Sequence, residues 1–389
     1  MAAAPDLAPP QPTCVRVAVS RAGHAGAAAR EAAAQISLPE TCFVLCFVPG
    51  GLDCQVVAGT LEEELEGLPV FGCSTAGQIT TEGYETEALL LLAFPKSHFR
   101  CASVLFEPLN PLSTTAIATD AQRAEQRFRH TAGWHRLGLI FTDGLSRQED
   151  ILISTLETVL GDLPIFGGSA GDGLRFDQTF VLHKGRALMD AAVLLLLETD
   201  LPFQGIGFDH FLPAGSHIVV TDADPEARKV FEINGAPAAR EYARLVGHAV
   251  EDLSPEIFAE NPLLIEYKNN HYVRAISDAD ETGALSFLAA IDDGLIMTLG
   301  LGQEITRTLT TGLDIHDHRG RSPDFVLGFD CVLRKLEIEQ KQLGRAVSDI
   351  LRAARVFGFN TYGEQHCGVH MNQTLVGVAF FEPDERALF

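Results

Sequence analysis

The sequence contains one pattern of the kind that serine hydrolases use. Residues 167–171 read Gly-Gly-Ser-Ala-Gly, which matches the GxSxG turn that exposes a nucleophilic serine, here Ser169, after a β-strand. Such a turn must open directly into a helix, whereas the next residues, GDGLRFDQTFVL, are typical of a loop and a strand. No nucleophile, base and orienting group stand together elsewhere in the sequence. We therefore expect binding rather than catalysis, with a serine hydrolase as the alternative that we do not favour.

Two glycine-rich turns could instead line a binding pocket. They read GCSTAG from Gly72 and GGSAGDG from Gly167, and they contain Ser74, Thr75 and Ser169. Glycines let backbone N–H groups come close to a ligand, and short hydroxyl side chains add hydrogen bonds there. These three residues are predicted to bind a carboxylate-bearing, amino-acid-like ligand. The alternative is a tight turn that satisfies only its own backbone.

Histidines and cysteines offer weaker candidates for a metal site. His366, Cys367 and His370 lie within five residues, but a closed zinc site needs four ligands. His316 and His318 are typical of an exposed loop. Cys331 is expected in the first turn of a helix, where the helix dipole can lower a thiol pKa, although a buried small side chain is the simpler interpretation.

The composition limits the class of protein. The chain has 389 residues, 46% of them hydrophobic, and a net charge of −23, which disfavours nucleic acid and anionic lipid as partners. Its longest apolar runs, 88–94 and 191–197, are too short to cross a bilayer. No secretory signal is visible, and eight cysteines without a CxxC pair fit reduced thiols. We expect a cytoplasmic protein with no membrane segment.

An internal repeat organises the chain. TLEEELEGLPVFG from Thr60 aligns without gaps on TLETVLGDLPIFG from Thr155, and each copy follows an apolar, strand-like run. This pattern predicts a strand, helix, strand and turn unit that occurs twice. Strands that are apolar throughout are buried on both faces by flanking helices. A fainter third copy, VFGFNTYGE, begins at Val356.

The repeat predicts an α/β protein with two closely packed domains and mixed sheets flanked by helices. We expect a disordered tail over residues 1–13, one domain over 14–224 and a second over 225–389, without a flexible linker between them. A long helix before Val356 carries an apolar stripe formed by Leu336, Leu343, Val347, Ile350 and Ala354. The stripe indicates core packing, with a partner or homodimer surface as the alternative.

Several blocks resemble the FIST family. VFGCSTAGQI and IFGGSAGDG are similar to turns of its N-terminal region, and FEINGAPAAREY, HYVRAI, FDCVLR and GFNTYGEQHCGVHMNQTLVGVAF are similar to blocks of its C-terminal region. The resemblance covers residues 15 to 381 and is closest to stand-alone members. It implies a sensory role in bacterial signal transduction with a small-molecule ligand such as an amino acid, and some stand-alone members regulate a partner histidine kinase.

The resemblance also implies haem as a cofactor, since some stand-alone members bind haem and sense nitric oxide. His370 is then the first candidate for the iron ligand, because it lies in the most family-like block and precedes an apolar strand. Tyr362 is the oxygen-ligand alternative, His366 is a further candidate, and Asn372 of the same block is a candidate ligand-binding residue. A haem-free sensor of an amino-acid-like molecule remains the alternative.

Overall fold

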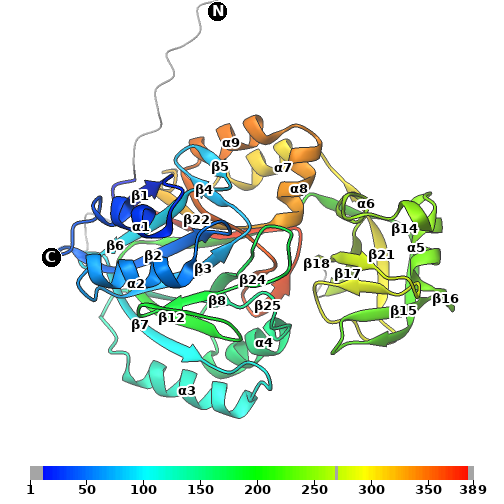
Figure 1. The fold of residues 1–389 in the computed structure, drawn as a ribbon, viewed down its shortest axis with the longest axis horizontal. Helices are drawn as coiled ribbons and strands as arrows, with labels where there is room; N and C mark the ends of the chain where they lie inside the picture. Colours follow the sequence, from blue (N-terminus) through cyan, green and yellow to red (C-terminus); the bar gives the residue numbers. More distant parts are fainter. Residues whose placement is uncertain (1–11, 268–269, 384–389) are drawn as a thin grey trace, which may run out of the picture.

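The protein consists of a large body and a smaller unit beside it (Figure 1). The structure is a computed structural model that describes residues 12–267 and 270–383. Most of the predicted tail, residues 1–13, therefore lies outside the described residues. Within the described part, no helix is both long enough and apolar enough to cross a bilayer.

Three repeats of one unit build the body. The first two run without interruption, and the third is interrupted after its first strand by the smaller unit. The first repeat contains β1 (Arg16–Ser20), α1 (Ala25–Ala33), β2 (Thr41–Pro49), α2 (Cys54–Glu64), β3 (Val70–Thr75), β4 (Gln78–Thr80), β5 (Gly83–Glu85) and β6 (Leu89–Pro95). The second contains β7 (Phe99–Phe106), α3 (Thr114–Arg127), β8 (His135–Thr142), α4 (Glu149–Leu160), β9 (Ile165–Ser169), β10 (Val181–His183), β11 (Arg186–Leu188) and β12 (Ala192–Thr199). The third contains β13 (Phe203–Phe208), α7 (Ile305–Gly312), β22 (Phe325–Cys331), α8 (Val332–Gln340), α9 (Gly344–Ala353), β23 (Val356–Thr361), β24 (Glu364–His366), β25 (Val369–Met371) and β26 (Leu375–Phe380).

Each repeat forms a sheet that is completed by a hairpin from another repeat. The sheet orders are β1-β6-β2-β3-β10-β11, β7-β12-β8-β9-β24-β25 and β13-β26-β22-β23-β4-β5. The hairpin of the second repeat thus completes the sheet of the first, that of the third completes the sheet of the second, and that of the first completes the sheet of the third. In every sheet the two central strands β2 and β3, β8 and β9, or β22 and β23 are parallel. This cyclic exchange locks the three repeats together.

The repeated Phe-Gly pair has a structural cause. Gly72, Gly167 and Gly358 occupy the same place in the three sheets, facing the parallel neighbour strand. A Cβ at these positions would lie 1.9, 1.9 and 1.7 Å from a carbonyl oxygen of that strand. Only glycine fits so close an approach of two backbones. The preceding phenylalanines, Phe71, Phe166 and Phe357, are buried in the central core.

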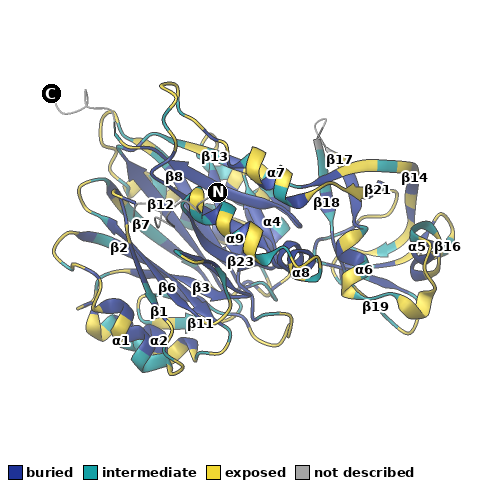
Figure 2. Cartoon of the chain, turned by 90° about the horizontal axis from the view of Figure 1, so that it is seen from above, coloured by how far each residue is buried: buried dark blue, intermediate teal, exposed yellow. Residues whose placement is uncertain are grey.

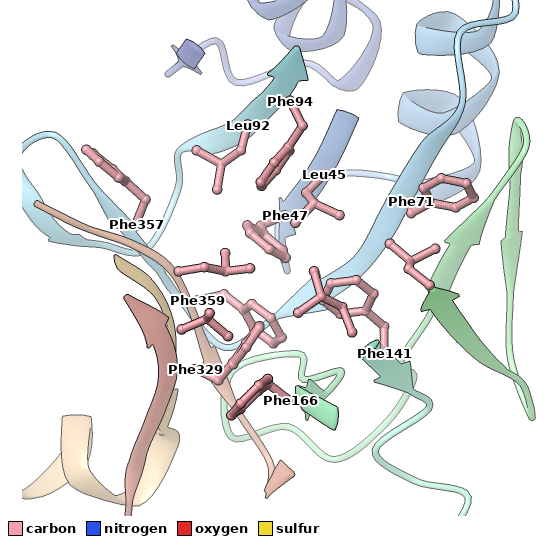
Figure 3. Close-up of a cluster of buried hydrophobic side chains, with 14 of the residues drawn as sticks. Leu45, Phe47, Phe71, Leu92, Phe94, Phe141, Phe166, Phe329, Phe357 and Phe359 are labelled. Carbon is pink, nitrogen blue, oxygen red and sulfur yellow. The ribbon is translucent and has the colours of Figure 1, made fainter. Parts of the chain in front are cut away.

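The central core lies between the three sheets, and the helices lie outside them (Figure 2). Figure 3 shows phenylalanines from all three repeats meeting there, including Phe47, Phe141 and Phe359. Phe47 and Phe359 have ring centroids 4.7 Å apart, and Phe141 and Phe359 have theirs 6.2 Å apart. Separate apolar clusters join each sheet to its outer helices. Strands covered on both faces need apolar residues throughout, which explains the unbroken apolar runs.

The smaller unit is inserted between β13 and α7. It is built on the strand order β18-β17-β21-β14-β15-β20-β19, and β16 pairs with β15. Its elements are β14 (Phe211–Asp224), β15 (Lys229–Ile233), β16 (Ala236–Pro237), α5 (Ala238–Val246), a 3-10 turn (Val250–Asp252), α6 (Pro255–Glu260), β17 (Leu263–Tyr267), β18 (Asn270–Arg274), β19 (Ile276–Ala279), β20 (Leu285–Phe287) and β21 (Ile296–Gly302). An apolar cluster that includes Phe211, Leu264 and Val273 from this unit packs against Cys331 and Tyr362 of the body.

The predicted fold class is confirmed, since mixed sheets are flanked by helices and the strand, helix, strand and turn unit repeats. Residues 70–77 and 165–172 lie in matching elements, and the faint third copy is β23. Asp224, the predicted domain boundary, is the last residue of β14. The predicted single long helix is wrong. It is divided into α8 and α9, and Gln342 between them has a φ of 55°.

Candidate ligand site at the meeting of three strand ends

In each repeat, the second of the two parallel central strands ends close to its counterparts in the body. β3 ends at Thr75, β9 at Ser169 and β23 at Thr361. Backbone hydrogen bonds join these ends, with N–H to carbonyl distances of 3.0 Å (Ala76 to Asn360), 3.0 Å (Gly171 to Ser74) and 2.8 Å (Ser169 to Gly363). Ligands of open α/β sheets bind at the carboxyl ends of parallel strands. This meeting point is therefore where the fold favours a ligand.

A cavity of about 400 Å³ opens beside the strand ends. Its wall carries both signs of charge, with Lys335 and Arg175 as cations and Asp172, Glu87 and Glu339 as anions. The rest of the wall is formed by Gly50, Gly51, Thr75, Ala76, Thr86, Gly173, Leu174, Val332 and Leu336. The volume lies in the range of small-molecule sites. A wall with both signs suits a ligand that has an anionic and a cationic group.

Lys335 is held in the wall of this cavity by α8. Its side chain is 8% exposed, and its Nζ donates to the carbonyl oxygen of Ala76 at 3.0 Å. Glu339, one helical turn further on, lies 3.9 Å from the same nitrogen. Burial lowers the pKa of the Lys335 ammonium, and Glu339 only partly opposes this shift. A desolvated lysine with a neutral acceptor and one distant carboxylate can be bound by an incoming anion.

Asp172 and Arg175 fix the loop that closes the other side of the cavity. Burial disfavours the charged form of Asp172, but the Tyr362 hydroxyl and the backbone N–H groups of residues 176–178 donate to its carboxylate and lower its pKa overall. Arg175 donates to the carbonyl oxygens of Asp172 and Gly50, both at 2.9 Å. Asp172 is therefore an ionised structural anchor, and Arg175 is a cation that faces the cavity.

A second cavity of about 470 Å³ adjoins the first. The two share Gly50, Gly51, Asp172 and Arg175, so Arg175 stands between them. The wall of the second cavity also includes Ser74 and Cys54, the first residue of α2. Burial raises the pKa of the Cys54 thiol to about 12, which leaves it protonated at neutral pH. Arg175 is the cation that lines both cavities.

The structure divides the four predicted ligand-binding residues into two groups. Thr75 lines the first cavity and Ser74 the second. The Thr75 hydroxyl donates to the carbonyl of Val48 at 3.0 Å, and the Ser74 hydroxyl accepts from the N–H of Phe180 at 2.9 Å. Both hydroxyls thus also hold their turns together.

Ser169 and Asn372 are buried away from these cavities. The Ser169 hydroxyl accepts from the Gln365 amide at 3.0 Å, and the Asn372 amide donates to the carbonyl of Tyr362 at 3.3 Å. Neither residue is in the wall of either cavity. Residues 170–180 form no helix, so the nucleophile-elbow geometry of a serine hydrolase is not present at Ser169.

His370, the first haem candidate, lies in the β24–β25 hairpin that completes the second sheet. It is 2% exposed, and its Nδ1 lies 3.3 Å from the Gln365 amide nitrogen. Its Nε2 has no hydrogen-bond partner among the described residues. A Cβ at Gly363 would lie 2.2 Å from the ring, so the backbone packs directly on the imidazole. Burial lowers the pKa of His370 and keeps the ring neutral.

Tyr362 and His366 are also committed to packing. The Tyr362 hydroxyl donates to Asp172, and its ring stacks on Phe176 with centroids 4.6 Å apart. His366 lies against Phe166 with ring centroids 5.5 Å apart. A third cavity, of about 550 Å³, lies between α7 and α9, and the walls of these three cavities contain no histidine among the described residues. The three candidates therefore do not fit a haem group in this arrangement.

The weaker metal and thiol candidates gain no support. Among the described residues, no group of three or more His, Cys, Asp or Glu side chains is placed to hold a metal ion. Cys331 is the last residue of β22 and directly precedes α8, rather than lying in its first turn, and burial raises its thiol pKa well above the usual value. Desolvation outweighs the helix dipole, so Cys331 is a buried protonated thiol.

The sequence interpretation missed Lys335, Arg175 and Glu339. Glu339 was included in the polar face of a predicted helix, Lys335 was not singled out, and Arg175 fell in a segment typical of a loop and a strand. One signal could have identified the lysine. The faint third repeat places α8 directly after a central strand, at the carboxyl end where ligands bind.

Comparison with known proteins identifies two domains. The FIST N domain model matches residues 42–236, and the FIST C domain model matches residues 238–367. An uncharacterized protein of Methanocaldococcus jannaschii is 26% identical over 247 residues, which cover 59% of this chain and 48% of that protein. The match thus spans about half of that relative's length.

Among solved structures, a cyanuric acid hydrolase from A. caulinodans matches with 10% identity and a TM-score of 0.27, over 48% of this chain and 71% of that chain. A likeness this low carries no argument about fold or activity.

Proposed function

The chain belongs to the FIST family, whose domains are sensory domains of signal transduction, and from that premise we propose that it senses a small, charged, amino-acid-like molecule in the cavity beside α8. The observation that carries the proposal is the cavity of about 400 Å³ whose wall presents the cations Lys335 and Arg175 together with the anions Glu87 and Glu339. The ligand's carboxylate binds Arg175 and Lys335, and its ammonium group binds the two glutamates. Charge-assisted hydrogen bonds of this kind are the strong ones in binding sites.

The position of the cavity suggests how binding is transmitted. Its wall combines the turn after β3, the loop after β9 and helix α8, so it contains residues from all three repeats. A ligand that bridges these segments stabilises one arrangement of the three relative to the others. We propose that a signalling protein, such as a histidine kinase, reads this arrangement in the cytoplasm. A homodimer remains a prediction.

Thermal unfolding with a panel of L-amino acids tests the proposal. A ligand at 100 times its Kd stabilises the folded state by about 2.7 kcal/mol, and the midpoint of unfolding rises. Arg175→Gln removes the guanidinium and is expected to weaken binding by roughly tenfold to a hundredfold, equivalent to a charged hydrogen bond of about 1.5–3 kcal/mol. Arg123→Gln on α3, where the arginine side chain is 55% exposed, is the matched control and retains the ligand shift.

Two results would reject this proposal. One is a panel in which no amino acid or related zwitterion shifts the midpoint of the wild-type protein. The other is a shift that Arg175→Gln and Arg123→Gln retain equally. A haemin titration tests the haem alternative, which the packing around His370 does not favour. A Soret band at one haem per chain that is lost in His370→Ala would support haem instead.

A further inference from the structure

Lys335 has the environment of a reactive amine. Its Nζ donates to the neutral carbonyl of Ala76, and its nearest described carboxylate, Glu339, is 3.9 Å away on a side chain that is 57% exposed. Asp172 stands in the same wall, but its carboxylate is bound to Tyr362 and to backbone N–H groups. Lys335 therefore lacks the close ion pair that holds most buried lysines in the charged form.

A glycine, Gly77, leaves space beside the Lys335 amine. A Cβ at Gly77 would lie 2.6 Å from Lys335 Nζ and 2.6 Å from Asn360 Oδ1. The lysine nitrogen and the amide oxygen are therefore neighbours across a residue that has no side chain. Asn360 is fully buried, and its Oδ1 has no hydrogen-bond partner among the described residues. A buried acceptor without a partner is costly unless a ligand or water satisfies it.

We propose that Lys335 captures small 2-oxo acids in this cavity as a reversible imine. This rests on the proposed function only in that the cavity beside α8 is open to small carboxylates. Arg175 binds the carboxylate of the 2-oxo acid, and the adjacent carbonyl carbon meets Nζ. Desolvated lysines that lose their proton readily are the ones that form Schiff bases with carbonyl ligands. Burial lowers the pKa of Lys335, so its ammonium loses a proton more readily than that of a solvent-exposed lysine.

The step needs no oxidant or reductant. Glu339 accepts the proton that the Lys335 ammonium loses, and the nitrogen lone pair then forms a bond to the carbonyl carbon. The π electrons of the C=O bond move to oxygen, which takes a proton from nitrogen to give a carbinolamine. Glu339 returns its proton to that hydroxyl, which leaves as water while the nitrogen lone pair forms the C=N bond. The net products are a protonated imine and one water molecule.

Reductive trapping tests the imine directly. The folded protein is incubated with pyruvate and sodium cyanoborohydride, and intact mass and peptide mapping follow the adduct. We expect one reduced pyruvate adduct per chain, located on Lys335, and no adduct with L-lactate, which has no carbonyl. Lys335→Arg keeps the positive charge and is expected to lose the adduct completely. Lys229→Arg, on β15 where Lys229 pairs with Asp280 at 2.8 Å, is the control and is expected to keep it.

A second variant guards against a folding defect in Lys335→Arg. Glu339 is more than half exposed, so Glu339→Gln is expected to fold normally and to slow adduct formation while the final site stays Lys335. Adducts spread evenly over the lysines of the wild-type protein, or an adduct that persists in Lys335→Arg at wild-type yield, would overturn the proposal.

The two proposals fail separately. If an L-amino acid shifts thermal unfolding of the wild-type protein but pyruvate leaves no adduct on Lys335, the imine is wrong and the sensor proposal stands. If pyruvate is trapped on Lys335 but no amino acid shifts unfolding or blocks the trapping, the imine stands and the amino-acid-like ligand is wrong. Competition by the amino acid against pyruvate trapping would place both in one cavity.

Discussion

Helix α8 carries charged side chains on two faces that are used differently. On the buried face, Arg334 is fully buried and belongs to a chain of polar contacts. The chain runs Tyr84 hydroxyl to Asp330, Asp330 to Arg334 at 2.7 Å, Arg334 to His210 Nδ1 at 3.0 Å, His210 Nε2 to Glu337 at 2.7 Å, and Glu337 to Lys341 at 2.6 Å. On the cavity face, Lys335 has one neutral acceptor and Glu339 at 3.9 Å. The charged groups of the buried face are therefore paired with one another within the fold, whereas the cavity face leaves the Lys335 ammonium available to a ligand.

The buried chain also spans the joint to the smaller unit. His210 lies between β13 and β14, and its carbonyl oxygen accepts from the N–H of Gln303, just after β21. Arg334 and Glu337 on α8 hold both ring nitrogens of His210. Because neighbouring residues of the same helix line the cavity, α8 connects the ligand site to the point where the smaller unit is attached.

Breaking the buried chain should give the largest effect on stability. Arg334→Met removes the partner of Asp330 and of His210 Nδ1, and leaves a buried carboxylate without its cation. Such a loss costs about 3–5 kcal/mol. The free energy of unfolding in urea measures it, with Lys335→Met on the cavity face as the comparison. Equal destabilisation by the two variants would contradict the difference between the two faces.

Two buried glutamates, Glu364 and Glu337, have pKa values that are shifted in opposite directions. Burial raises the pKa of Glu364 to about 8, since its partners Thr361 and Thr374 are neutral. Burial also opposes ionisation of Glu337, but His210 and Lys341 lower its pKa overall. Between pH 4.5 and about pH 8 the folded protein holds a proton on Glu364 that the unfolded chain releases. This group alone therefore lowers stability as pH rises through that window.

Glu364→Gln should remove this loss, because glutamine stays neutral and keeps the shape. We expect the free energy of unfolding of the variant, relative to that of the wild-type protein, to rise by about 2–4 kcal/mol as pH increases from about 5 to about 9. Glu337→Gln should instead lower the free energy of unfolding, because the fold stabilises the charged form of Glu337. Urea unfolding across this pH range measures both. A stability difference between Glu364→Gln and the wild-type protein that does not change with pH would show that Glu364 is ionised when buried.

The repeat was readable from the sequence because each copy repeats the same physical demands. Apolar strands, a helix and the Phe-Gly pair recur wherever a strand lies against a parallel neighbour, as Gly72 and Gly167 show. The hairpin exchange was not readable. A sequence shows that 364–371 is a family-like block, but not that it completes the sheet of another repeat through β9. The preference for His370 followed from that block, whose role here includes building the second sheet.

The cavity was missed for a related reason. Periodicity indicated one helix with an apolar stripe, whereas the break at Gln342 separates α8 from α9. Residues on α8 then face either the cavity or the buried chain, depending on strands far away in sequence. Lys335 contacts the turn after β3, 259 residues earlier. Contacts of that range depend on the tertiary fold, and local pattern contains no signal for them.

Filling the space beside Lys335 should have a moderate effect. Gly77→Ala places a Cβ on both Lys335 Nζ and Asn360 Oδ1, so the ends of two side chains must move. Overpacking of this kind costs about 1–2 kcal/mol. The displaced lysine should bind ligand and trap pyruvate much more weakly than wild type. Gly133→Ala, where a Cβ meets no atom within 4 Å but φ is 80°, is the control for backbone strain alone. Equal ligand shifts in the two variants would contradict a role for the space.

Replacing the cavity lysine itself should have the smallest effect on stability. Lys335→Met keeps most of the length of the side chain and removes a desolvated ammonium that lacks a close counterion. Replacing a poorly compensated buried charge by an apolar group is often neutral or stabilising, so we expect a change within about 1 kcal/mol at pH 7. The loss of the hydrogen bond to Ala76 works in the opposite direction.

The stability of Lys335→Met relative to the wild-type protein should change with pH, which a packing effect would not cause. Because burial lowers the pKa of Lys335, the unfolded chain binds this proton more tightly than the folded protein. Wild-type stability from this group therefore rises as pH increases from the lowered pKa toward the unfolded value of 10.5. Lys335→Met has no such gain, so any advantage it has at about pH 7 should shrink by about pH 10. Urea unfolding at both pH values measures this. An advantage that grows with pH would mean that Lys335 is held as a stabilised cation, and the cavity face of α8 would then resemble the buried one.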